Sequence, residues 1–134
     1  MSMKNIILTV IIFLGIISRL IYHSPNFTPI FSICIFSGMM FDDNRKMFII
    51  PLSCMFISDL FIGIHSTILF VYFSLLLVVF FGKINSNRSS FKRLIATIFA
   101  SNAVFFIITN FGVWLMQAGF YDKTLYGLIS CYIA

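Results

Sequence analysis

Charged residues are scarce in this sequence. They make up 10% of its 134 residues, and only 4 residues are acidic. A water-soluble domain carries about 25% charged residues, because its surface must be covered by groups that water solvates. Composition therefore argues against a soluble domain and favours a protein whose solvent is the lipid bilayer. The mean hydropathy of +1.06 and the 18 phenylalanines indicate the same environment, since Phe, Ile and Leu partition well into hydrocarbon.

Motifs for catalysis are also missing. The sequence has no G-x-S-x-G, no phosphate-binding loop and no H-E-x-x-H, so we expect no enzymatic activity and no cofactor. Ser58, Asp59 and His65 supply the residue types of a hydrolase triad. Ser58 and His65 would lie two turns apart on one helix, however, and could not meet.

The cysteines give no sign of a metal or redox site. They form no C-x-x-C pair and no Cys/His cluster, so we expect small packing residues at Cys34, Cys54 and Cys131. His23 and His65, with one carboxylate, would satisfy the ligand count of a metal site. Because the two histidines come from separate loops without a spacing signal, we favour ordinary loop histidines and expect no metal.

We attribute the net charge of +5 to basic residues in the loops between the apolar segments. Nucleic-acid binding is a poor explanation, because no basic face remains once the apolar segments are assigned to a membrane.

Lys4 precedes an apolar run at 6–17 that ends without an A-x-A cleavage pattern. We therefore expect a retained first helix and not a signal peptide.

Hydrophobic runs divide the chain into six segments, separated by polar or turn-forming residues. They cover residues 6–21, 29–41, 47–64, 66–81, 91–116 and 124–134. The second is short for a span, so it should lie among the other helices. The last, of about ten residues, would cover about 15 Å, half of the hydrocarbon core, and we expect a sixth helix that continues beyond the chain. The predicted fold is all-α, a single polytopic transmembrane domain over residues 1–134, with five membrane-spanning helices and a truncated sixth.

Loop charges predict the orientation of this bundle. With the N-terminus in the cytoplasm, the outer side holds only Arg19 and Lys123. The inner side holds the other basic residues, Lys4, Arg45, Lys46, Lys83, Arg88, Lys92 and Arg93. This asymmetry follows the positive-inside rule, so we expect a multi-pass protein of the bacterial cytoplasmic (inner) membrane. The polar, proline-containing stretch 19–29 then lies on the outer side.

Helix rise places several polar groups at a similar depth. Counted from the nearest inner basic residue, Arg19 lies about 22 Å, Asp59 about 21 Å and Asn110 about 25 Å towards the outer side. We therefore expect one outward-facing polar pocket. Its candidate substrate-binding residues are Arg19, His23, Asn26, Asp59, His65, Asn110 and Trp114.

Asp59 is the carboxylate that falls inside an apolar segment. An ionised group at the centre of a bilayer costs about 2.5–3.5 kcal/mol, so it usually has a partner. Arg19 is the first choice and His65 the second. Asp59 then either binds a substrate or an ion, or forms a structural ion pair that ties the third segment to the first. Asn102, near the middle of the fifth segment, is expected to form an interhelical hydrogen bond.

Short motifs in every segment except the fourth carry a resemblance. They are Arg19, His23-Ser-Pro-Asn-Phe-Thr-Pro29, Phe36-Ser-Gly38, Pro51-Leu52, Ser58-Asp59-Leu60, Ile62-Gly63-Ile64-His65, Asn110-Phe-Gly-Val-Trp114, Gly127-Leu128 and Cys131-Tyr132. With them the chain resembles an uncharacterised bacterial membrane-protein family similar to the substrate-binding S components of energy-coupling-factor (ECF) transporters.

The resemblance implies a six-helix bundle with both termini in the cytoplasm and an outward-facing pocket for a vitamin or a metal. The outer polar residues would line or cap that pocket. A coupling membrane subunit and ATPase subunits would be the partners, because S components have no ATPase of their own. The alternative is a structural or assembly membrane protein without a ligand, in which the polar residues serve helix packing.

Overall fold

The computed structural model describes residues 3–21, 29–86 and 90–134. Over these residues it contains six α-helices and no strand, which confirms the all-α prediction. The helices are α1 (Met3–Leu20), α2 (Ile30–Met40), α3 (Asn44–Ile62), α4 (Ile68–Ile84), α5 (Phe91–Leu115) and α6 (Leu125–Ile133).

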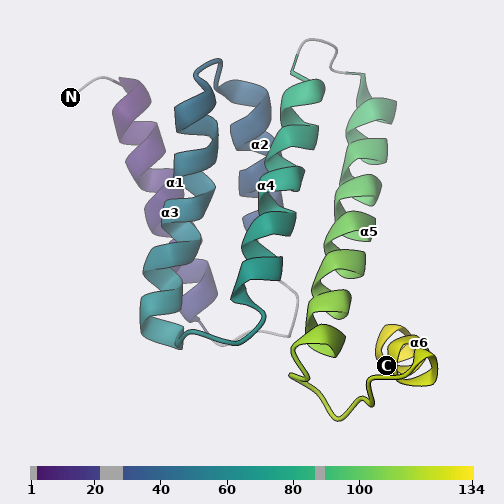
Figure 1. Cartoon of the computed structure of the whole chain (residues 1–134). Coiled ribbons are helices and arrows are strands. Elements are labelled where there is room, and N and C mark those ends of the chain that lie inside the picture. The colour runs from purple at the N-terminus through teal and green to yellow at the C-terminus, as the bar shows by residue number, and fades with distance from the viewer. Residues whose placement is uncertain (1–2, 22–28, 87–89) are drawn as a thin grey trace.

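Five helices run side by side with nearly parallel axes, and α6 lies beside the last turns of α5 (Figure 1). α1 packs against α3, α2 packs against both α3 and α4, and α5 packs against α4 and α6. One end of the bundle, which we call the α2–α3 end, holds the turn between α2 and α3. The start of α1, the last turn of α4 and the first turn of α5 lie at this same end. The α3–α4 loop lies at the opposite end, which we call the α3–α4 end.

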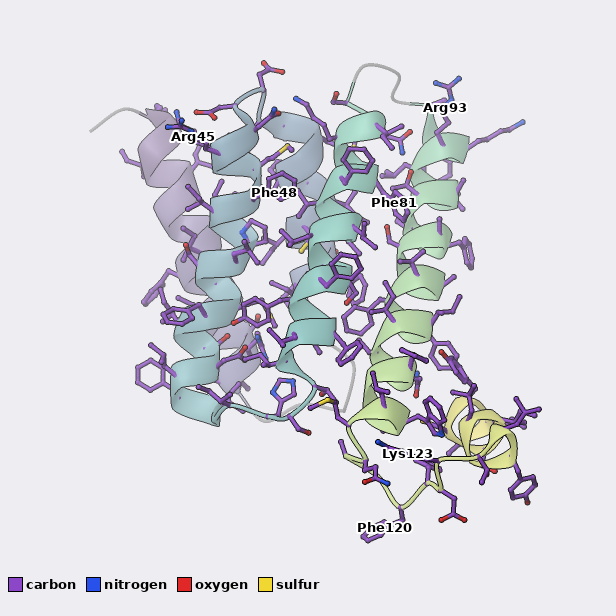
Figure 2. The ribbon with its side chains drawn as sticks, in the orientation of Figure 1. Arg45, Phe48, Phe81, Arg93, Phe120 and Lys123 are labelled. Atoms are coloured by element: carbon purple, nitrogen blue, oxygen red, sulfur yellow. The ribbon has the colours of Figure 1, made fainter. Side chains whose placement is uncertain are left out.

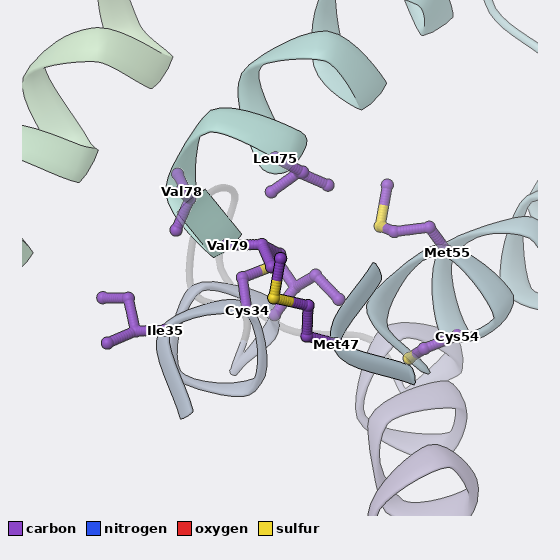
Figure 3. Close-up of a cluster of buried hydrophobic side chains, with 9 residues drawn as sticks. Cys34, Ile35, Met47, Cys54, Met55, Leu75, Val78 and Val79 are labelled. Carbon is purple, nitrogen blue, oxygen red and sulfur yellow. The ribbon is translucent and has the colours of Figure 1, made fainter. Parts of the chain in front are cut away.

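The core lies where α2 meets α3 and α4, as expected for a short second segment embedded among its neighbours. Buried side chains from the three helices form one cluster (Figure 3): Ile30, Cys34, Ile35, Met47, Cys54, Met55, Leu75, Val78 and Val79. Cys34 and Cys54 are fully buried and, like Cys131, are free thiols. Their position in the core agrees with a packing role.

Two glycines let α2 and α4 touch backbone to backbone. A Cβ atom on Gly38 would lie 2.1 Å from the carbonyl oxygen of Val79, and one on Gly82 would lie 2.4 Å from the carbonyl oxygen of Ile35. Both distances are far below van der Waals contact. Small residues allow the same close approach in membrane-protein helix pairs, where packing is a main source of association energy.

A serine compensates for a proline inside α3. Pro51 has no backbone N–H, so the carbonyl of Met47, one turn earlier, lacks its usual helical partner. The hydroxyl of Ser37 on α2 donates a hydrogen bond of 2.7 Å to that carbonyl oxygen, and Ser37 is 1% exposed. The interruption in α3 therefore becomes a link to α2.

Helix boundaries follow the sequence closely. α3 begins at Asn44, three residues before the predicted start, and the Asp43 side chain accepts a hydrogen bond from the backbone N–H of Arg45.

Among the described residues, α5 is the one helix long and apolar enough to cross a membrane, whereas α2 and α4 are apolar but shorter. Length and hydropathy of the helices thus identify one candidate span where the apolar segments of the sequence predict five.

Candidate functional site

The buried carboxylate of Asp59 is paired with Arg19, the first-choice partner. Arg19 lies in the last turn of α1 and Asp59 in the last turn of α3. Nη2 of Arg19 lies 2.9 Å from Oδ1 of Asp59, and the two side chains are 15% and 3% exposed. The ion pair therefore links α1 to α3 in a largely water-free position, as the depth estimates predicted.

Tyr72 on α4 completes the site, and the sequence analysis missed it. Its hydroxyl donates a hydrogen bond of 2.9 Å to Oδ2 of Asp59. Asp59 lies three residues before the end of α3 and Tyr72 four residues after the start of α4. Because α3 and α4 are antiparallel neighbours, these offsets of about 4.5 and 6 Å from the connecting loop place both at one depth, a signal that the sequence contained.

The carboxylate is held by charge on one side and by a hydrogen bond on the other. Nη1 of Arg19 is directed at the sulfur of Met55, one turn before Asp59 on α3. Within the described part of the chain Oδ1 of Asp59 accepts no well-aligned hydrogen bond, so its contact with Arg19 is mainly an ion pair. A guanidinium, a carboxylate and a phenol from three helices thus meet at one point, which we call the Arg19–Asp59–Tyr72 cluster.

The structure does not gather all seven predicted site residues. His65 is exposed in the loop between α3 and α4, and its backbone carbonyl accepts a hydrogen bond from the N–H of Ile68. Among the described contacts of Asp59, the partners are Arg19 and Tyr72, not His65. His23 and Asn26 lie outside the described residues.

Asn110 and Trp114 lie on α5, which packs mainly against α4 and α6 and, among the described residues, has no substantial packing contact with α1 or α3. The Asn110 side chain donates to the carbonyl of Phe106 on its own helix, and its backbone carbonyl accepts a weak hydrogen bond of 3.4 Å from the thiol of Cys131. The indole N–H of Trp114 donates to the carbonyl of Asp122 at 3.0 Å. Both residues serve the junction of α5 with α6 and its preceding loop, away from the Arg19–Asp59–Tyr72 cluster.

The prediction for Asn102 was wrong. Its side-chain amide donates a hydrogen bond of 2.8 Å to the carbonyl of Ile98, four residues earlier on α5, and Asn102 is exposed. Helix rise gives a position along the helix but cannot say which way the side chain faces. An exposed amide that bonds to its own helix makes no interhelical link.

Two grooves stand out, and neither lies at the cluster. One, of about 290 Å³, lies between α4 and α5 near the α2–α3 end, and is lined by Phe81, Ile84, Asn85, Arg93, Ala96, Thr97 and Ala100. The other, of about 300 Å³, is almost wholly apolar and is lined by Phe70, Phe73, Ile107, Ile108, Phe111 and Tyr132. Across 3–21, 29–86 and 90–134, no three His, Cys, Asp or Glu side chains come close enough to hold a metal ion.

The chain belongs to DUF6580, a family of unknown function, whose model matches residues 1–134. No curated protein and no solved structure matches the chain. The family assignment therefore covers the full sequence and carries no activity with it.

Proposed function

We propose that the chain is a multi-pass membrane protein that binds a small solute from the outer side, as an S-component-like subunit of a transporter. The membrane placement is supported first by the surface of the helices. Large apolar side chains are exposed on every helix, for example Phe13, Phe36, Phe61, Phe73, Phe99 and Ile129, one from each of α1 to α6. A soluble bundle would instead turn its apolar faces inward and its polar faces outward.

α5 supports the placement most directly. The core helix of a soluble protein can have the same length and hydropathy, but it would be mostly buried. Only 11% of the most apolar window of α5 is buried within the chain. In water that helix would expose a large apolar surface, whereas in lipid the same surface is solvated.

Helix lengths agree with several crossings. α1, α3 and α4 have 18, 19 and 17 residues, or about 25–29 Å, close to a hydrocarbon thickness of about 30 Å. α2, at about 16 Å, would cross only with help from its surroundings. Arg45 and Arg93 lie at the α2–α3 end and Lys123 at the opposite end (Figure 2), as expected if the α2–α3 end faces the cytoplasm.

The Arg19–Asp59–Tyr72 cluster is the observation that carries the solute-binding proposal. It lies in the last turns of α1 and α3, close to the end that this orientation turns outward. Ionisable groups at membrane depth are costly, and they commonly mark substrate or ion pathways. A small vitamin-like solute or a metal ion could exchange contacts with the carboxylate, the guanidinium or the phenol.

Transport would require further subunits. Nothing in the sequence resembles a nucleotide-binding motif, so a coupling membrane subunit and ATPase subunits would supply movement and energy. The small residues of α1 that such a partner could contact are Gly15 and Ser18, and Gly15 is buried here against the Cys54 sulfur of α3. A coupling surface would therefore use other residues of the bundle.

A structural role is the competing proposal, and one observation favours it. The Asp59 carboxylate has protein partners already, an ionic partner from α1 and a hydrogen-bond donor from α4, and needs no ligand to balance its charge. Buried ion pairs often fix the register of elements without taking part in chemistry. In that case the cluster ties three helices together and no solute binds.

The two proposals are separated by ligand binding to the purified full-length chain. Copurified small molecules are identified by mass spectrometry, and thermal stability is measured against a panel of vitamins and divalent metal ions. Solute binding predicts a ligand-dependent rise in melting temperature that D59N abolishes. The matched control D122N removes an exposed carboxylate and should keep that rise. No copurified ligand and no shift across the panel would leave the structural role.

A further inference from the structure

We propose that the groove between α4 and α5 near the α2–α3 end binds one anionic phospholipid. The headgroup phosphate would contact Arg93 and an acyl chain would lie in the apolar part of the groove. The inference rests on the proposed membrane placement, which turns this end towards the cytoplasmic leaflet. It concerns the opposite end of the bundle from the Arg19–Asp59–Tyr72 cluster.

The lining of the groove changes from polar to apolar along α5. Arg93 lies in the first turn of α5, and Thr97 follows one turn further. Ala96 and Ala100 line the groove one turn apart on the same helix, opposite Phe81 and Ile84 of α4, which supply apolar surface. Arg93 and Ala100 are separated by about 10 Å of helix, a length that suits the first carbons of an acyl chain below a headgroup.

The polar residues at the mouth are largely occupied with one another. The Asn85 side-chain amide donates to the hydroxyl of Thr97, and that hydroxyl donates to the backbone carbonyl of Arg93. These bonds join the end of α4 to the start of α5. Among the described residues that line the groove, Arg93 supplies the cationic group. Figure 2 shows Arg93 at the start of α5 and Phe81 on α4.

Charge selects the kind of headgroup. The sequence has no acidic residue between Asp59 and Asp122, so α4 and α5 contain no carboxylate. Ion pairs within the described part of the chain join Arg19 to Asp59 and Lys83 to Asp42, and neither involves Arg93 or its exposed neighbour Lys92. A phosphodiester would supply the missing negative charge. A zwitterionic headgroup would also bring a cation towards two basic side chains, which is unfavourable.

The test is native mass spectrometry on the full-length chain with phosphatidylglycerol and phosphatidylcholine of identical acyl chains. Bound phosphatidylglycerol should exceed bound phosphatidylcholine by about fivefold, the preference expected when one basic side chain acts near an anionic headgroup. R93Q should remove this preference. The control R45Q removes an exposed arginine at the same end, from α3 and outside the groove, and should retain it.

A second pair of variants tests the apolar part of the site. A100L fills the groove and should lower the retention of bound phosphatidylglycerol, whereas A103L adds the same volume at an exposed position of α5 outside the groove and should not. Equal retention of both lipids by the parent chain, or equal losses in R93Q and R45Q, would refute the lipid site. Displacement by excess inorganic phosphate would also refute it, because the site would then recognise an ion only.

Reconstitution distinguishes this inference from the proposed function. The same preparations are incorporated into lipid nanodiscs before the lipid measurements. A chain that does not incorporate refutes the membrane placement itself, whereas an incorporated chain without lipid preference refutes only the lipid site. Solute binding is read separately, through the thermal shift that D59N removes.

Discussion

The phenol of Tyr72 on α4 donates a hydrogen bond of 2.9 Å to the carboxylate of Asp59 on α3. α3 and α4 otherwise touch sparsely, because α2 lies against both of them. The same carboxylate is paired with Arg19 on α1. One side chain therefore connects three helices near one end of the bundle, and its removal should loosen all three.

Neutralising Asp59 should destabilise the protein strongly. In D59N the Arg19 guanidinium stays largely buried without its counter-charge, and breaking a buried pair in this way costs about 3–5 kcal/mol. We expect a clear fall in melting temperature in detergent, measured without added ligand. D122N, at an exposed position, should melt with the parent chain. Unchanged stability and expression of D59N would contradict a structural role for the ion pair.

Removing the Tyr72 hydroxyl should have a smaller effect. Y72F keeps the aromatic ring but withdraws the donor from a charged acceptor, which costs about 1.5–3 kcal/mol. The free energy of unfolding in mixed micelles should fall by that amount. Y126F, which changes an exposed tyrosine of α6, serves as the control. If Y72F and Y126F unfold alike, the hydrogen bond makes no net contribution.

Ser37 should matter only while Pro51 is present. S37A leaves the buried carbonyl of Met47 without a donor, at a cost of about 1–3 kcal/mol. In the P51A background the restored backbone N–H can bond that carbonyl within α3, so the same serine substitution should cost much less. A double-mutant cycle on unfolding free energies measures the difference. Equal costs in both backgrounds would show that Ser37 does not compensate for the proline.

The two glycines between α2 and α4 should tolerate no side chain. The added Cβ of G82A would meet the backbone of Ile35, which cannot move aside without separating the helices. Overpacking of this kind costs about 1–3 kcal/mol or more. G15A meets side-chain atoms of Cys54 and Ile33, which can shift, so it should be milder. The melting temperatures of the two variants in detergent test this order. A lower melting temperature for G15A than for G82A would contradict it.

Depth along the helices was predictable from the sequence. A rise of about 1.5 Å per residue put Arg19 and Asp59 at one level, and the two side chains are paired. The apolar runs likewise located each helix to within a few residues, because the loops between them are short and polar. The Asp43 side chain, in the charged turn just before the third apolar run, caps α3.

Lateral position was not predictable in the same way. Asn110 was expected at the same level, but α5 packs mainly against α4 and α6, and in the described part of the chain it has no substantial packing contact with α1 or α3. Nothing in the spacing of polar residues says which helices are neighbours. The contact of Ser37 with Met47 depends on that same neighbourhood, as does the backbone crossing at Gly38 and Gly82. When a helix has apolar side chains on all sides, its sequence pattern does not indicate which side faces a neighbouring helix.

The partner of Arg19 comes two helices later in the chain, and this order has a consequence for biogenesis. When α1 leaves the ribosome, its arginine has no counter-charge, because α3 has not yet been synthesised. In the proposed membrane placement a lone cation in hydrocarbon would be unfavourable, so α1 should stay close to the insertion machinery, or keep Arg19 near the lipid headgroups, until Asp59 arrives. Release of α1 into the bilayer would then coincide with completion of α3.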